Sequence, residues 1–303
     1  MLQYSEKSMR HSQLKAFHHV ALLGGFSRAA EALFLTQPAI SEQVKKLEQD
    51  HDTLLFHRER KRVRLTEEGE QLFLLTKQYF EIEQQIEEYM SSTSAAVDGE
   101  LRIVADSAHH ITFFLGNFRK RYPDISVTLH TGNTEDILEE LRAYNAEIGI
   151  VGSLSPGGDM EALNLGSTKI TAFAARGSSL AKKSRLTLKE LSELPLIFRE
   201  QGSKTRQKLE EEAKKQGLTL KPAIVAEGRE AVREVVASGA GIGFVSQAEY
   251  GHDDRLSQIQ LADADIEMSE TLVHLGQRRD VKVIRAFMDF ARTAQNGKDS
   301  AGG

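Results

Sequence analysis

The segment SRAAEALFLTQPAISEQVKKLEQ, residues 27–49, predicts two short helices joined by a tight turn. Ser27 can cap the first helix, whose consecutive alanines would let a neighbouring helix approach closely. Thr36 can cap the second helix, and Pro38 is tolerated in its first turn because the N–H groups there lack intrahelical partners. Such a pair is typical of a helix-turn-helix, which presents its second helix to the DNA major groove. The alternative is an ordinary helical hairpin with a solvated polar face.

The residues around this pair fit the DNA-binding interpretation. Upstream, apolar residues recur at helical spacing from Leu14 to Ala21 and stop at Gly24-Gly25, which predicts a preceding helix. In the second helix of the pair, the side opposite the apolar stripe carries Gln37, Ser41 and Lys45, each four residues apart. These side chains suit base edges and phosphates.

A basic hairpin is predicted directly after these helices. Residues 54–56 have the pattern of a strand, and HRERKRVRL, residues 57–65, carries five Lys/Arg between Arg58 and Arg64. We expect a wing in which Arg58 and Arg60 contact phosphates beside the minor groove. A helix-turn-helix followed by a basic hairpin is a winged helix-turn-helix, predicted here for residues 1–66.

The charge of the chain is unevenly distributed. Residues 1–66 carry eleven Lys/Arg and seven Asp/Glu, a net charge of +4, which leaves −9 on the remaining residues. A basic head on an acidic body indicates that the head alone meets a polyanion, and the alternative is a local excess of charge on a solvated face. The absence of cysteine excludes disulfides, Cys-zinc sites and thiol nucleophiles. No apolar run reaches about 18 residues, so we expect no membrane partner and a cytoplasmic location.

Residues 67–94 lack proline and predict one long helix after Thr66, which can cap it. Apolar residues repeat there with spacings of three and four, which predicts a dimer seam made of Leu72, Leu75, Tyr79, Ile82, Ile86 and Tyr89. The alternative is an amphipathic helix lying on the core of its own chain. A dimer would place two recognition helices about one DNA turn or more apart and predicts an inverted-repeat operator. Residues 67–98 are thus the expected linker and hinge.

Strand and helix patterns alternate from residue 99 onwards. Short apolar segments such as LRIVA, residues 101–105, and GIGFVS, residues 241–246, are separated by helical or turn sequence. This alternation predicts an α/β domain over residues 99–303 with mainly parallel sheets. Such sheets bind ligands at the carboxyl ends of their strands, where helix N-termini converge.

Polar residues suited to an anion follow four of these predicted strands. Hydroxyls and backbone N–H groups at helix N-termini stabilise negative charge, so we expect a small anionic effector. The candidate contacts are Ser107, His109, Asn133, Thr134, Ser203, Thr205, Arg206 and Arg229. Two alternatives stay open: the Ser, Thr and Asn residues are first of all potential helix caps, and the two arginines can pair with Glu210 or Glu230.

The motifs that would indicate an enzyme are incomplete. Residues 202–205, GSKT, lack the earlier glycine and the Gly-Lys step of a phosphate-binding loop, and residues 239–243 precede a strand, unlike a dinucleotide-binding fingerprint. His109 and His110 are adjacent, so a helix would point their rings about 100° apart, which is poor for one metal ion. We therefore expect no catalytic residue, no cofactor and no metal.

The N-terminal residues resemble a known family, the LysR-type transcriptional regulators. The resemblance is carried by residues 14–70, in the order AA-E-L, T-Q-P-A-I-S, V-K-K-L-E, LF-R and LT-E-G, and extends over nearly the whole chain. It implies that the residues at or near DNA are Ser27, Arg28, Thr36, Gln37, Pro38, Ala39, Ser41, Lys45 and Arg58. Ala39 departs from the family pattern, since many members carry serine there.

The resemblance further implies a dimeric or tetrameric regulator of promoter DNA, with RNA polymerase as another partner. Its effector domain would have the two-lobed periplasmic-binding-protein fold, with lobe one at residues 99–166 and 267–296, lobe two at 167–266, and a hinged cleft between them. More narrowly, residues 199–211 and 227–256 resemble regulators linked to 2-aminoethylphosphonate catabolism, which implies an aminophosphonate-like effector with Asp106 or Glu227 near its amine. The alternative is a DNA-binding regulator without a small-molecule effector.

Overall fold

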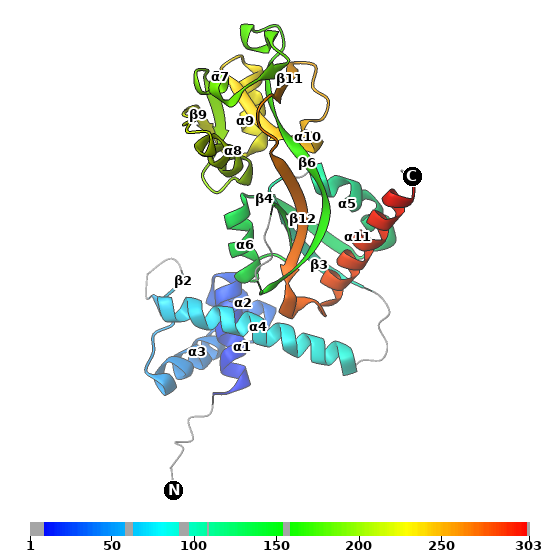
Figure 1. The fold of residues 1–303 in the computed structure, drawn as a ribbon. Coiled ribbons are helices and arrows are strands. Elements are labelled where there is room, and N and C mark those ends of the chain that lie inside the picture. Colours follow the sequence, from blue (N-terminus) through cyan, green and yellow to red (C-terminus); the bar gives the residue numbers. More distant parts are fainter. Residues whose placement is uncertain (1–8, 58–62, 91–96, 108, 154–157, 302–303) are drawn as a thin grey trace. The chain divides into compact units, whose positions relative to one another are not determined.

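A computed structural model describes residues 9–57, 63–90, 97–107, 109–153 and 158–301. The chain divides into two compact units, residues 1–94 and 95–303, and Figure 1 shows the first as helical and the second as a mixture of strands and helices. We call these units the head and the body and describe each by itself.

The head consists of three helices, a two-stranded hairpin and a long helix. The elements are α1 His11–Leu23, α2 Phe26–Ala32, α3 Gln37–His51, β1 Phe56–His57, β2 Arg64–Leu65 and α4 Glu67–Met90. Phe17, Ile40 and Leu47 are fully buried in its core. This burial stabilises helices that are too short to be stable alone.

One predicted cap in the head is wrong. Helix α2 begins at Phe26 with Gly25 as its N-cap, so Ser27 lies inside the helix instead of capping it. The reason is packing, because the Phe26 ring lies against the Phe56 ring, with 5.7 Å between centroids, and joins the core from the first helical turn.

Helix α4 is fixed to helix α1 by a buried polar contact. His18 Nδ1 lies 3.0 Å from the Thr76 hydroxyl, and its ring packs on Phe80 with 4.7 Å between centroids. Burial lowers the pKa of His18 from 6.5 to about 4, and the charges of His19 and Lys77 act in the same direction. The imidazole is therefore neutral at physiological pH, as a buried hydrogen-bonded group should be.

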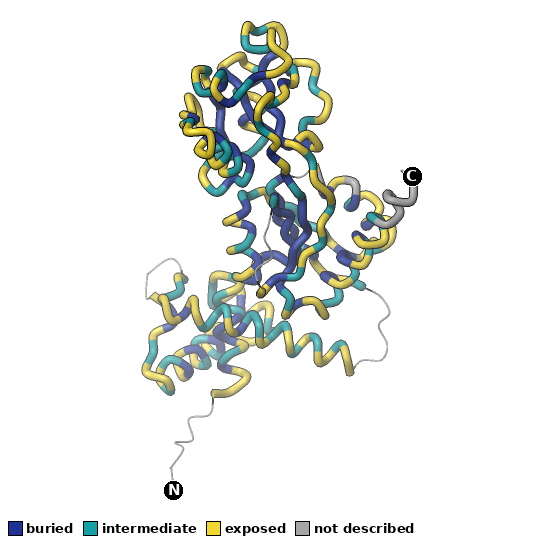
Figure 2. The backbone as a smooth tube through the Cα atoms, in the orientation of Figure 1, coloured by how far each residue is buried: buried dark blue, intermediate teal, exposed yellow. Residues whose placement is uncertain are grey.

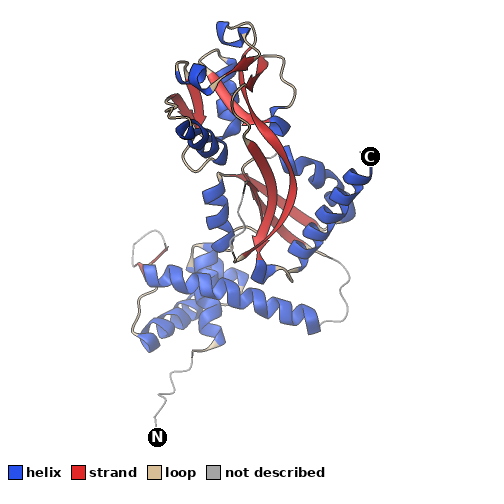
Figure 3. Ribbon diagram, in the orientation of Figure 1, coloured by secondary structure: helices blue, strands red, loops and turns tan. Residues whose placement is uncertain are grey.

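Figure 3 shows the strands of the body in red. They form a sheet with the strand order β4-β3-β5-β12-β6-β10-β8-β9, while β11 pairs with β6 and β7. The strands are β3 Gly99–Ala105, β4 Ile125–Thr131, β5 Ile148–Gly152, β6 Met160–Ala175, β7 Arg185–Leu186, β8 Leu196–Arg199, β9 Pro222–Ala226, β10 Ile242–Ser246, β11 Leu256–Leu261 and β12 Glu267–Leu275. The helices are α5 His109–Arg121, α6 Thr134–Arg142, α7 Leu188–Ser192, α8 Lys204–Lys215, α9 Gly228–Ala237, α10 Gln247–Tyr250 and α11 Lys282–Ala301, with 3-10 turns η1 Ser179–Lys182 and η2 Gly276–Arg278.

This sheet is mixed, whereas the sequence predicts mainly parallel pairing. Strand β3 is parallel to β4 and β5, and β8 is parallel to β9 and β10, as strand–helix–strand units require. The long strands β6 and β12, however, are antiparallel to each other, and β6 is also antiparallel to β10 and β11. Periodicity within a short segment cannot reveal pairing between strands so distant in sequence.

Strands β6 and β12 run through two lobes that have separate cores. In lobe one, α5 and α11 pack on β3 and β5, and the Phe118 and Phe287 ring centroids are 5.0 Å apart. In lobe two, α7 and α8 pack on β8 and β10, and the Phe198 and Phe244 centroids are 5.5 Å apart. Figure 2 shows the buried backbone following the sheet in both lobes. Each lobe can therefore hold its shape while the strands between them bend.

Candidate nucleic-acid interface and effector site

Helix α3 presents an exposed polar N-terminus. Its N-cap is Thr36, as predicted, and the Thr36 hydroxyl accepts a hydrogen bond from Ala39 N at 3.4 Å. The apolar stripe of α3 is buried, which leaves its opposite face to solvent. Among the expected DNA contacts, the exposed residues are Ser27, Arg28, Thr36, Gln37, Pro38 and Lys45, and the half-buried ones are Ala39 and Ser41. Such donors beside free helical N–H groups can bind phosphates and base edges.

Arg28 and the predicted hairpin are two further parts of the expected DNA-binding surface. Arg28 Nη2 donates to Gly24 O at 2.8 Å, so its guanidinium closes the end of helix α1 as well as facing solvent. Strand β1 is antiparallel to β2, with His57 opposite Arg64, which gives the predicted hairpin. Arg58 and Arg60 lie outside the described residues.

Helix α4 carries an exposed apolar stripe where the dimer seam is predicted. Five large apolar side chains of this stripe are exposed, and Tyr89 reaches 88% exposure. These residues are Leu75, Tyr79, Ile82, Ile86 and Tyr89. Leu72 differs, because it is half-buried against the core of the head. An apolar stripe in water is unfavourable unless another surface covers it.

In the body, two helix N-termini meet where lobe one faces lobe two. Helix α6 of lobe one is capped by Asn133, whose Oδ1 accepts hydrogen bonds from Glu135 N at 2.9 Å and Asp136 N at 3.1 Å. In lobe two, Gly202 precedes helix α8 with a φ of 86°. A Cβ placed on Gly202 would lie 2.7 Å from Asn133 Oδ1, so the close approach of the lobes requires glycine there. We call this contact and the helix ends beside it the interlobe junction.

Two buried hydroxyls lie at the interlobe junction without a hydrogen-bond partner among the described residues. They belong to Thr134, the first residue of α6, and Ser203, the N-cap of α8, which are 2% and 3% exposed. Thr205, in the first turn of α8, is also buried. Leaving a buried hydroxyl unsatisfied costs on the order of 1–3 kcal/mol, so such groups call for a ligand or water.

The end of strand β3 adds further polar groups to lobe one. Ser107 is buried and accepts a hydrogen bond from His109 N at 3.2 Å, whereas His109 itself is exposed. Asp106 and Glu270 both lie beside Gly152: Asp106 Oδ2 would be 3.1 Å from a Cβ there, and Glu270 faces Gly152 across the strand pair. Sequence reasoning missed Glu270, because its strand reaches this site through antiparallel pairing that no local pattern signals.

Arg206 and Arg229 are engaged by protein groups, which is the alternative that the sequence left open. Arg206 Nε donates to Glu210 Oε1 at 2.8 Å. Arg229 Nη1 donates to Glu249 O at 3.1 Å, and its Nη2 lies 3.4 Å from Glu230 Oε1. Both guanidinium groups therefore have protein partners, and the buried Nε of Arg229 is the atom without one among the described residues.

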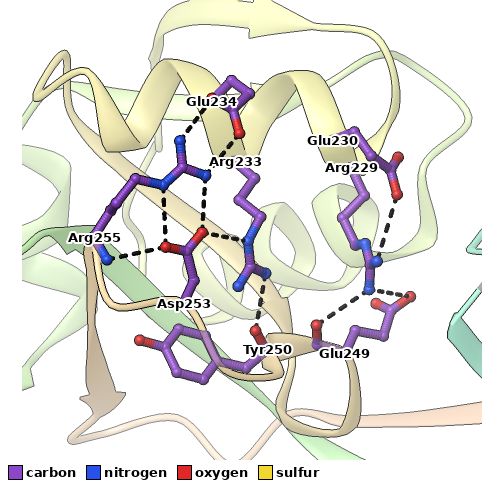
Figure 4. Close-up of polar contacts among 8 residues, drawn as sticks. All are labelled: Arg229, Glu230, Arg233, Glu234, Glu249, Tyr250, Asp253 and Arg255. Carbon is purple, nitrogen blue, oxygen red and sulfur yellow. Dashed lines mark hydrogen bonds and ion pairs between the residues drawn. The ribbon is translucent and has the colours of Figure 1, made fainter.

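Arg229 belongs to a wider ionic cluster that fixes helix α9 to residues 249–255, shown in Figure 4. Arg233 Nε donates to Asp253 Oδ2 at 3.1 Å, and Arg255 bridges Asp253 and Glu234. The hydrogen bonds from Arg255 hold the pKa of Asp253 well below its usual range. Its charged groups are therefore paired within lobe two, apart from the buried Nε of Arg229, which has no hydrogen-bond partner among the described residues.

Other kinds of site receive no support from the described parts of the chain. Within them, no three His, Asp or Glu side chains are grouped so that they could hold a metal ion. None of the helices described is both long and apolar enough to span a bilayer. Among the described residues, polar groups suited to a ligand gather on the exposed face of α3 and at the interlobe junction.

Comparison with known proteins covers both units. Residues 11–70 match the bacterial regulatory helix-turn-helix protein, lysR family, and residues 94–296 match the LysR substrate binding domain. The HTH-type transcriptional activator CmpR of Synechocystis sp. is 30% identical over 283 residues, which is 92% of this chain and 93% of CmpR.

Solved structures share the fold at lower identity. Full-length CbnR complexed with its target DNA gives a TM-score of 0.65 at 19% identity, over 94% of this chain and 99% of that one. The regulatory domain of Synechocystis CcmR in complex with 2-PG gives a TM-score of 0.59 at 23% identity, over 65% of this chain and 98% of that one. With its two family matches and its helix-turn-helix and two-lobed units, the chain belongs to the LysR family of DNA-binding transcriptional regulators.

Proposed function

We propose that this regulator changes its hold on promoter DNA when a small anion binds at the interlobe junction. The observation that carries the proposal is the pair of buried hydroxyls of Thr134 and Ser203, which lie at two facing helix N-termini and have no hydrogen-bond partner in the described part of the chain. An anion there would accept hydrogen bonds from both hydroxyls and be stabilised by both helix dipoles. The complex of the CcmR regulatory domain with 2-PG supports the idea that this fold can hold a small ligand.

The effector that we propose carries an amine as well as an anionic group, as an aminophosphonate does. The Asp106 and Glu270 carboxylates beside Gly152 would attract the amine. Thr134 and Ser203 would take the anionic end. Arg206 and Arg229 have no part in this binding mode, because Glu210, Glu230 and Glu249 already engage them.

A bend in the long strands would let the ligand change the body. Gly166 in β6 has a φ of 135°, and opposite it the register of β12 shifts between Glu270 and Thr271. Such irregularities let strands bend. A ligand that binds one lobe arrangement more tightly than another shifts the population towards it.

For the DNA, we propose that the exposed face of α3, with Thr36, Gln37, Ser41 and Lys45, enters the major groove and that the wing contacts phosphates. The exposed stripe of α4 would pair with a second copy, and two such dimers would associate through their bodies. The resulting tetramer would bend an inverted-repeat promoter and act on RNA polymerase in the cytoplasm.

Calorimetric titration of the full-length protein with 2-aminoethylphosphonate, inorganic phosphate and a dicarboxylate tests the effector site. We expect one of them to bind, to bind at least about tenfold more weakly to Ser203→Ala, and to change the footprint on promoter DNA, since the lost charge-assisted hydrogen bond stabilises by more than about 1.4 kcal/mol. Ser178→Ala is the matched control, because it removes from lobe two another buried hydroxyl that lacks a hydrogen-bond partner within the described ranges. Footprints without any ligand response would favour a regulator that has no small-molecule effector.

A further inference from the structure

The turn between α2 and α3 places an aromatic residue where helix ends favour glycine. Helix α2 ends in a Schellman motif, in which Leu35 N donates to Ala30 O at 2.9 Å and Phe34 N donates to Glu31 O at 3.2 Å. Phe34 occupies the left-handed position of this motif, with a φ of 55°. This conformation is unfavourable for a bulky L-residue, whose Cβ comes too close to the following carbonyl oxygen.

The same motif at other helix ends uses residues that suit it or that gain contacts from it. Helix α1 ends with Gly24, and helix α3 ends with Asp52, a residue type that tolerates the left-handed region. Helix α6 ends with Tyr144 at a φ of 59°, but this residue is 7% exposed. Its hydroxyl accepts a hydrogen bond from Gln277 at 2.7 Å, and its ring packs on the Arg278 guanidinium. These contacts offset the unfavourable backbone of Tyr144.

Phe34 gains no such contact within the described residues. It is 96% exposed, and its ring meets no aromatic or cationic partner in that part of the chain. Residues 34–38 form an uninterrupted exposed run, which joins Phe34 directly to Thr36 and Gln37 at the start of α3. The aromatic side chain is therefore continuous with the surface that we propose to face DNA.

We propose that Phe34 is a DNA-contacting residue that packs on apolar atoms of the duplex beside the recognition helix. The shared chemistry is a carbon surface, offered either by deoxyribose or by a thymine methyl group. Removing the ring from water in the complex would supply the contact that the free protein lacks. This inference rests on the proposed placement of α3 in the major groove.

The test uses the full-length protein and fluorescence anisotropy with a duplex enriched by selection from a random pool. Phe34→Asn replaces the ring with a residue that tolerates the left-handed conformation. We expect an unchanged or higher midpoint of thermal unfolding together with about tenfold weaker DNA binding, because partial burial of a phenyl ring corresponds to roughly that ratio. Phe34→Tyr keeps the ring and should bind nearly as well as the unaltered protein.

Two control variants separate this role from general effects. Leu22→Ala truncates another exposed apolar side chain of the head, which is 54% exposed, and should leave DNA binding unchanged. Tyr144→Asn makes the same kind of change at the buried aromatic residue and should lower the unfolding midpoint instead of raising it. Opposite stability effects at Phe34 and Tyr144 would show that one ring packs within the chain and the other does not.

The DNA-binding measurements separate a failure of the proposed α3 placement from a failure of the proposed role of Phe34. If the unaltered protein binds no duplex in preference to random sequence, the placement of α3 fails and this inference fails with it. If it binds and Phe34→Asn binds equally well, the placement of α3 stands and the role of Phe34 is refuted. Replacing thymine by uracil distinguishes the two carbon surfaces: a matching loss with the unaltered protein identifies the methyl group, and no loss identifies deoxyribose.

Discussion

The head and the body offer their polar groups to ligands in opposite ways. At the start of α3, the Thr36 hydroxyl is exposed and already bonded to Ala39 N. At the interlobe junction, the Thr134 and Ser203 hydroxyls are buried and have no partner among the described residues. A large DNA duplex can bind to an exposed surface whose polar groups are already hydrogen-bonded. A small anion, in contrast, is enclosed by polar groups that are shielded from water. In the described residues, the Thr36 hydroxyl at the start of α3 is thus already hydrogen-bonded, whereas the two hydroxyls of the interlobe junction are not.

The two units also differ in how buried polar groups stabilise them. The head relies on a neutral pair, His18 and Thr76, between α1 and α4. Lobe one of the body contains a buried ionic group in which Glu147 binds Arg102 and Arg278. Burial alone would raise the pKa of Glu147, but the hydrogen bonds and charge of Arg102, together with the charge of Arg278, hold it below the usual range.

The largest effect is expected from breaking the ionic group of the body. Glu147→Ala removes one carboxylate partner from the Arg278 guanidinium, which is 4% exposed. The free energy of unfolding of the body should fall by about 3–5 kcal/mol, as for other buried charges that lose a partner. Urea unfolding followed by hydrogen exchange, which separates head peptides from body peptides, measures this. Glu234→Ala removes an exposed partner of Arg255 and should change little. Equal losses of stability in the head and in the body would contradict the expectation that the effect is confined to the body.

Acid should affect the head first. The pKa of His18 is about 4 in the folded protein and 6.5 when unfolded, so the folded state binds fewer protons between these values. The stability that a neutral His18 contributes is complete above about pH 6.5 and is lost progressively as the pH falls towards 4, by up to about 3 kcal/mol. Glu147, with a pKa below 4.5, affects the body only at lower pH.

Unfolding curves of the head between pH 7 and pH 4.5 measure this difference. The variant His18→Leu should flatten the pH dependence in the head while leaving the body unchanged. A steep dependence that survives in His18→Leu would show that another group is responsible.

The smallest effects on stability should differ between the start of α3 and the interlobe junction. Thr36→Ala removes a helix cap and should lower the stability of the head by about 1 kcal/mol. Ser203→Ala removes an unsatisfied hydroxyl and should leave the ligand-free body unchanged or slightly more stable. Thermal unfolding of both variants without ligand tests the pair. A marked loss in Ser203→Ala would mean that its hydroxyl is already satisfied and that the junction is closed to ligands.

Much of the head could be predicted from local sequence. The Thr36 cap, the Gly24 stop and the spacing of apolar residues in α3 and α4 all act within a few residues. The local sequence is therefore sufficient to predict these helices. The prediction at Ser27 is wrong because Phe26 packs on Phe56, a contact between segments far apart in the sequence.

The body was harder to predict because its candidate site depends on strand pairing and on the approach of the two lobes. From the sequence, Arg206 and Arg229 could bind either an anion or a neighbouring glutamate. In the folded chain, their side chains contact the glutamates. The antiparallel β5–β12 pair placed Glu270 opposite Gly152, which Asp106 also approaches, and no periodicity indicates this pairing.

The sequence by itself determined the family, the order of the units, the recognition helix and the positions of the polar strand-to-helix junctions, because caps, turns and helical spacing are properties of adjacent residues. The tertiary structure alone decided which of those polar groups are left without partners, because burial and hydrogen bonding depend on what the rest of the chain brings to them. Asn133 is used as a cap and Gly202 packs against it, and the hydroxyls of Thr134 and Ser203 are thereby enclosed without a partner in the described chain.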